Sequence, residues 1–148
     1  MNIPHDNDDP DAELEQLPLA ECWRLVRTQT VGRFAVNRPG YGPHVVPVNF
    51  IVTEDDTIVF RTGAGTKLNA SMMRIVAMQF DEIDASRHTG WSVLVQGTAR
   101  WLYEEQDPVE VDTWAPGPRP YVVRVTPVHV SGRRIQLHQM DTDDRGDM

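Results

Sequence analysis

The chain of 148 residues contains a single cysteine, Cys22, and a single lysine, Lys67. One cysteine excludes an intramolecular disulfide and a cysteine-rich metal site. The five histidines lack the spacing of common metal-ligand motifs, so we expect no metal. A basic surface is also missing, since the net charge is −8, and this argues against a nucleic-acid partner.

Long apolar runs are absent as well. Residues 1–13 are acidic and polar instead of basic and apolar like a secretory signal, and no run approaches the roughly 20 apolar residues of a membrane span. We therefore expect a cytoplasmic protein that does not bind a membrane. The compositions of residues 1–13 and 141–148 predict a disordered leader and a disordered tail around one domain, residues 14–140.

Short runs rich in β-branched and aromatic residues predict strands. They span residues 31–36, 45–52, 57–62, 75–80, 92–102 and 121–130, and a turn at Ser131 and Gly132 leads to a last strand at 133–137. Pro47 predicts a bulge or an edge position in its strand, and Gly97 predicts a bulge or a barrel bend. Because strands do not alternate with long helices, the pattern predicts a mainly β, small closed sheet.

Two short helices are expected. Apolar residues recur at helical spacing from Leu19 to Val26, which predicts an amphipathic helix with Cys22 as a buried, inert thiol. Residues 66–73 predict a second helix. The acidic segment 103–114 is predicted to be partly helical, and the proline-rich residues 115–120 are predicted to be irregular.

The stretch FRTGAGTK, residues 60–67, combines features that bind a phosphate group. Its glycines let backbone N–H groups turn toward an anion, and the start of the following helix adds unpaired donors. The side chains add two cations and two hydroxyls, from Arg61, Thr62, Thr66 and Lys67. A cation in a first helical turn costs about 0.3–1 kcal/mol, which a bound anion would offset. The stretch therefore predicts a phosphate site; the plain alternative is a solvated lysine on a surface turn.

Neither common nucleotide motif is present. A P-loop requires Gly directly before the Lys and Ser or Thr directly after it, but Thr66 precedes Lys67 and Leu68 follows it. A dinucleotide fingerprint would need a third glycine where Leu68 stands. The predicted phosphate site is therefore of another type.

The strand at 45–52 carries apolar residues on both faces, with Val46 and Phe50 on one and Val45 and Ile51 on the other. A barrel of this size has little internal room for a ligand. We expect one face to line the barrel and the other to lie at a symmetric subunit interface. The alternative is that the first helix covers the outer face.

Four stretches, in this order along the chain, carry a resemblance to a known family: PVNF at 47–50, FRTGAGTK at 60–67, VAMQFDEID at 76–84 and GWSVLVQGTA at 90–99. Together they resemble the flavin-binding split β-barrels related to pyridoxamine 5′-phosphate oxidase. The closing SGRRI at 131–135 resembles small actinobacterial members similar to nitroimidazole reductases. The resemblance covers residues 17–137 and implies a Greek-key-like antiparallel split barrel with a few short helices.

The resemblance also implies a homodimer with FMN in a groove between subunits. It places the phosphate at the glycine-containing loop, the isoalloxazine ring over the strand at 45–52, and a further contact on the strand after residue 90. The implied residues, in that order, are Arg61, Thr62, Thr66 and Lys67; Val46, Pro47, Val48 and Asn49; and Trp91 and Ser92. The C-terminal arginine and histidine motif of true pyridoxamine phosphate oxidases is absent, so their substrate is not implied.

Three functions stay open. The first is an FMN-dependent oxidoreductase that passes a hydride between NAD(P)H, or another reductant, and a small molecule. The second uses the deazaflavin F420 instead, as some relatives do, and the third is a flavin- or haem-binding protein without turnover. No residue is assigned as a proton donor, and Trp91, Trp101 and Trp114 are more simply explained as packing residues of the core or an interface.

Overall fold

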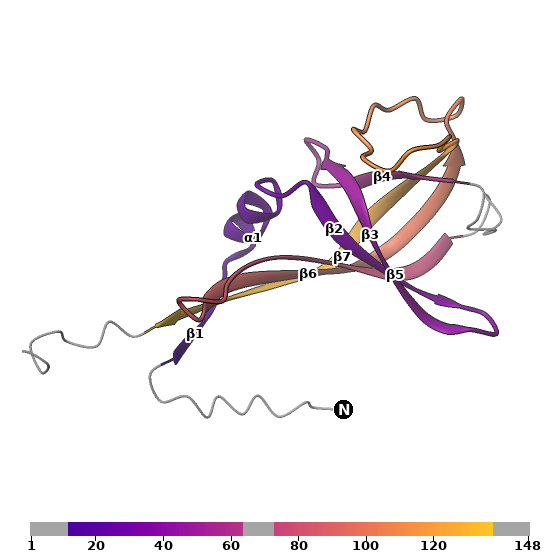
Figure 1. Ribbon diagram of the computed structural model, residues 1–148. Helices are drawn as coiled ribbons and strands as arrows, with labels where there is room; N and C mark the ends of the chain where they lie inside the picture. Colours follow the sequence, from indigo (N-terminus) through magenta and orange to yellow (C-terminus); the bar gives the residue numbers. More distant parts are fainter. Residues whose placement is uncertain (1–11, 64–72, 138–148) are drawn as a thin grey trace, which may run out of the picture.

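The computed structural model describes residues 12–63 and 73–137, and within them it contains one helix and seven strands (Figure 1). They are β1 (Ala12–Gln16), α1 (Leu19–Val26), β2 (Val31–Arg38), β3 (Gly42–Val52), β4 (Ile58–Thr62), β5 (Met73–Asp84), β6 (Thr89–Tyr103) and β7 (Tyr121–Leu137). β1 begins before the expected domain start at residue 14. No helix of the described ranges is long and apolar enough to cross a membrane.

The strands form a closed ring in which every pair is antiparallel. The order is β7, β4, β3, β2, β5 and β6, and β6 pairs again with β7. β1 adds to the C-terminal end of β7 outside this ring. The predicted mainly β split barrel is confirmed.

Side chains that point inward fill the ring, because successive residues of a strand face opposite sides. The rings of Phe34 and Phe60 lie 4.8 Å apart, and the ring of Trp101 lies 6.0 Å from that of Phe34. Trp91 and Trp101 are both buried in this core, which confirms their packing interpretation. Since side chains occupy the interior, a ligand of any size has to bind outside it.

Helix α1 confirms the first predicted helix. Its buried residues, Cys22, Trp23, Leu25 and Val26, belong to the core. The helix packs mainly against β6 and β7, so it does not cover the outer face of β3. Burial raises the pKa of the Cys22 thiol, which therefore stays protonated at neutral pH.

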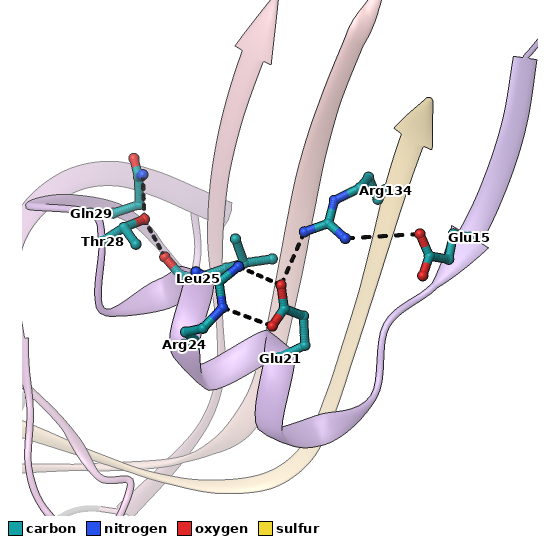
Figure 2. Close-up of polar contacts among 7 residues, drawn as sticks. All are labelled: Glu15, Glu21, Arg24, Leu25, Thr28, Gln29 and Arg134. Atoms are coloured by element: carbon teal, nitrogen blue, oxygen red, sulfur yellow. Dashed lines mark hydrogen bonds and ion pairs between the residues drawn. The ribbon is translucent and has the colours of Figure 1, made fainter. Parts of the chain in front are cut away.

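Glu21 links α1 to β7 (Figure 2). Its carboxylate accepts hydrogen bonds from Arg24 Nε at 2.8 Å and Arg24 Nη2 at 2.5 Å, and from Arg134 Nη2 at 3.1 Å. Arg134 Nη1 lies 3.8 Å from Glu15 of β1, so this one guanidinium contacts two acidic residues. The hydrogen bonds from Arg24 and then from Arg134 lower the pKa of Glu21 to about 2.

Three expectations about secondary structure are wrong. The turn at Ser131 and Gly132 does not exist, because β7 runs through both residues and pairs there with β6. Segment 103–114 contains no helix: β6 ends at Tyr103 and turns and irregular chain follow. Met73, expected at the end of a helix, begins β5, while residues 66–72 lie outside the described residues.

Two expectations about single residues are confirmed. The β6–β7 register shifts between Gln96 and Gly97, and a Cβ on Gly97 would lie 2.1 Å from the Thr126 carbonyl oxygen, so the bulge needs glycine. Pro47 pairs with Arg33 of β2, whereas β4 pairs with β3 only from Phe50 onward. Among the described strands, Pro47 therefore has a partner on one side, as an edge position requires.

Candidate functional site

Asn49 and Arg61 both lie on the outer face of the ring, at the end of the pairing between β3 and β4. The last pair between β3 and β4 is Phe50 with Phe60, and both rings are buried in the core. Asn49 and Arg61 directly adjoin that pair, so their side chains point away from the interior. The following residue, Thr62, has its side chain on the opposite face of β4 from Arg61.

The backbone of β3 before Asn49 is an open edge. Residues 46–48 pair with Gly32, Arg33 and Phe34 of β2, and no other described strand pairs with them. Val46 and Val48 pack against the core, and Pro47 is exposed. Within the described residues no strand covers the free side of this segment, which is where the predicted ring contacts would lie.

A long loop, residues 104–120 (hereafter the β6–β7 loop), lies beside this place and is the orange loop beyond β4 in Figure 1. Its ends are joined, because the Glu104 N–H donates to the Pro120 carbonyl at 2.9 Å and the rings of Tyr103 and Tyr121 lie 5.3 Å apart. Arg124 of β7 donates two hydrogen bonds to Asp107, at 3.0 and 3.1 Å. The loop is therefore fixed to the barrel at its base.

The β6–β7 loop covers an outer part of the barrel. Val59 of β4 and Val122 of β7 point away from the interior and are not part of the main core cluster. Both are nevertheless 0% exposed. Val59 pairs with Arg124, which holds the loop through Asp107, and Val122 pairs with Arg61. These contacts place the loop over the outer side of β4 and β7.

The loop also holds both candidate residues. Asn49 Oδ1 accepts the Trp114 N–H at 2.9 Å, and Asn49 Nδ2 donates to the Thr30 carbonyl at 3.1 Å. Arg61 Nε donates to the Arg119 carbonyl at 3.0 Å, and Arg61 Nη2 is paired with the Glu104 carboxylate. The Arg61 side chain is 21% exposed, so it remains accessible at the surface.

Trp91 and Ser92 lie elsewhere on the same chain. They pair with Glu82 and Asp81 of β5. Arg61, in contrast, pairs with Val122 of β7, and Val122 pairs on its other side with Leu102, near the opposite end of β6. Trp91 lines a groove of about 590 Å³ whose other residues come from β5, β6, β7 and the β5–β6 turn, not from β3 or β4. One chain therefore does not bring these residues to Arg61, and the predicted contributors Thr66 and Lys67 lie outside the described residues.

Large apolar side chains are exposed on the outer face of β3, β5 and β6. Val45, Ala35 and Ala77 are successive partners across β3, β2 and β5. Around Ala77 lie side chains that are 59%, 65%, 85% and 37% exposed; this outer apolar face consists of Val45, Met73, Ile75 and Leu94. Exposed apolar side chains on neighbouring strands are a feature that interaction surfaces often have.

The chemistry around Arg61 suits an anionic group. Arg61 supplies a guanidinium, which binds oxyanions through pairs of N–H groups. The open edge at residues 46–48 lies beside it, and there the Pro47 carbonyl is an acceptor. Within residues 12–63 and 73–137 no group of His, Cys, Asp or Glu side chains is placed to hold a metal.

The family profile described as pyridoxamine 5′-phosphate oxidase matches residues 18–134. The chain belongs to this family. An uncharacterized protein of Mycobacterium tuberculosis is 31% identical over 136 residues, which cover 83% of this chain and 86% of that protein.

Two solved structures of family-like proteins resemble this one. The FAD-binding protein of Mycobacterium smegmatis is 32% identical, with a TM-score of 0.62 over 82% of this chain and 98% of that chain. A protein of Corynebacterium glutamicum, provisionally named a pyridoxamine 5′-phosphate oxidase, is 27% identical, with a TM-score of 0.67 over 84% and 100%. At these coverages, the similarity extends along nearly the whole described chain.

Sequence reasoning missed the contacts of the β6–β7 loop. Glu104, Trp114 and Arg119 all contact candidate residues, yet they follow Arg61 by more than 40 positions. The available signal was the length of the irregular segment, because long loops in compact domains are often functional. Trp114 is 65% exposed in this chain, so it is not a core residue.

Proposed function

We propose that the protein is a flavin-dependent oxidoreductase that binds FMN on the outer face of the barrel, with the phosphate at Arg61. The observation that carries this proposal is the position of the Arg61 guanidinium next to the open edge of β3. Family membership and the FAD-binding relative from Mycobacterium smegmatis support a flavin as the ligand.

Each part of the site has a defined task in this proposal. Arg61 binds the phosphate together with Thr66 and Lys67, whereas the Thr62 side chain lies on the opposite face of β4 and has no part in this proposal. The backbone of residues 46–49 lies under the ring, where Pro47 offers only a carbonyl because it has no N–H. The bound flavin supplies hydride transfer, and the chain anchors and orients it. NAD(P)H in the cytoplasm is the proposed reductant, and a small molecule is the acceptor.

A second copy of the chain completes the proposed site. Two observations support a homodimer: the outer apolar face is exposed, and Ser92 lies away from Arg61 within one chain. Ser92 is partly exposed and points outward, whereas the Trp91 side chain is 8% exposed and packs in the core. We therefore expect Ser92, and not the indole of Trp91, to reach the flavin of the partner subunit.

The absorption spectrum of the purified protein tests this function. After incubation with FMN and removal of free ligand by gel filtration, the protein should retain the visible bands of an oxidised flavin. Under anaerobic conditions, NADPH or NADH should bleach them, and a small acceptor should restore them. Retention of F420 or haem but not FMN would contradict the cofactor assignment. Retained FMN that no reductant bleaches would contradict the oxidoreductase.

A further inference from the structure

The β6–β7 loop occupies one edge of the Arg61 guanidinium. Nε donates to the Arg119 carbonyl at 3.0 Å, and Nη2 is paired with Glu104. A guanidinium binds an oxyanion best through two parallel N–H groups on one edge. In this structure the edge formed by Nε and Nη2 is shared between a neutral carbonyl and a carboxylate, so a phosphate that uses Nη2 meets an acidic competitor.

Glu104 can leave Arg61 without opening the loop. Its carboxylate side chain is 47% exposed, so water can solvate it in another rotamer. The backbone of the same residue is held separately, since its N–H donates to the Pro120 carbonyl. The ion pair between Asp107 and Arg124 fixes the next part of the loop independently. Displacement of one side chain is therefore sufficient.

The competition depends on the charge of the ligand. A phosphate ester and Glu104 are both anions, so they repel each other and compete for one cation. A flavin without phosphate places no charge at Arg61 and leaves the Glu104 pair intact. Glu104 thus weakens the binding of one class of ligand and not of the other.

We propose that Glu104 sets how strongly this site discriminates between phosphorylated and unphosphorylated flavins, by neutralising Arg61 until a phosphate displaces it. This inference rests on the proposed function, because it takes the flavin phosphate to bind Arg61. It assigns a specificity role to a residue of the β6–β7 loop, which makes no contact with the flavin itself in this scheme.

Parallel titrations with FMN and riboflavin test the proposal. Flavin fluorescence is followed for the wild type, for Glu104→Gln and for Glu105→Gln, which changes the net charge equally at an exposed neighbouring position. Glu104→Gln should tighten FMN binding roughly two- to tenfold, leave riboflavin binding unchanged, and lose its effect in an Arg61→Gln background. Thermal unfolding of each apo-protein verifies that the variants are folded.

The outcomes separate this inference from the proposed function. If wild type and Glu104→Gln bind FMN equally, or if Glu104→Gln tightens the binding of FMN and riboflavin alike, the role assigned to Glu104 is refuted and the flavin site stands. An equal increase in FMN affinity from Glu105→Gln would show that the effect comes from the overall charge, and it would also overturn the inference. If no folded variant binds either flavin, the proposed function fails, and the role of Glu104 fails with it.

Discussion

The sulfur of Cys22 lies so close to Gly132 that a methyl group on the glycine would sit 2.6 Å from Sγ. At the same place the Leu17 N–H donates to the Gly132 carbonyl at 2.9 Å. Helix α1 thus approaches the backbone of β7 at a position where only glycine leaves room. The glycine serves helix–strand packing and not a turn.

We predict that Gly132→Ala destabilises the protein by about 1–3 kcal/mol, because the added methyl group overpacks the contact with Cys22. Urea unfolding measures the loss. Ser131→Ala, at the exposed neighbouring position, is the control and should be nearly neutral. In a Cys22→Ala background the cost of Gly132→Ala should shrink; an undiminished cost would show that the sulfur is not the obstacle.

The Cys22 thiol should not react in the native state. It is 1% exposed, and burial raises its pKa, so the thiolate that reacts with thiol reagents is scarce. Labelling with a chromogenic disulfide reagent should be slow without denaturant and fast in urea. Rapid labelling of the native protein would contradict the packing of α1.

Glu21 should make the free energy of unfolding depend on pH. Its pKa of about 2 in the folded protein lies below its ordinary value of 4.5, so the unfolded chain binds more protons between these values. Its contribution is therefore complete above about pH 4.5 and is lost as the pH falls toward about 2. Urea unfolding of wild type and Glu21→Gln should give a stability difference at neutral pH that shrinks across this window. A difference independent of pH would contradict the linkage.

The local sequence predicted elements whose cause is local. Pro47 and Gly97 impose their backbone constraints wherever they stand, and the apolar spacing from Leu19 to Val26 defines a helix face. Gly132 was misread because glycine marks both turns and close packing, and only the position of Cys22 distinguishes them. The pairing of Arg61 with Glu104 depends on β4 and β6 both pairing with β7 in the closed ring, which no local pattern encodes.

The proposed dimer buries the outer apolar face. Ile75, at 85%, is the most exposed of its four residues, so Ile75→Asp should place a charge in the interface and yield a monomer. Val128→Asp, at a residue that is 77% exposed on β7, is the matched control and should remain dimeric. Light scattering at micromolar concentration measures the masses. A monomeric wild type with flavin bound would contradict the shared site.

The most direct test of the central claim is the affinity of Arg61→Ala for FMN. Removing a charge-assisted contact costs about 1.5–3 kcal/mol, or roughly a ten- to hundredfold loss of affinity. Arg87→Ala, which removes a side chain that is 79% exposed in the β5–β6 turn, should bind FMN like the wild type. Lys67→Ala should weaken FMN binding as Arg61→Ala does. If fluorescence titration shows FMN affinity unchanged in both Arg61→Ala and Lys67→Ala, the phosphate does not bind where this account places it.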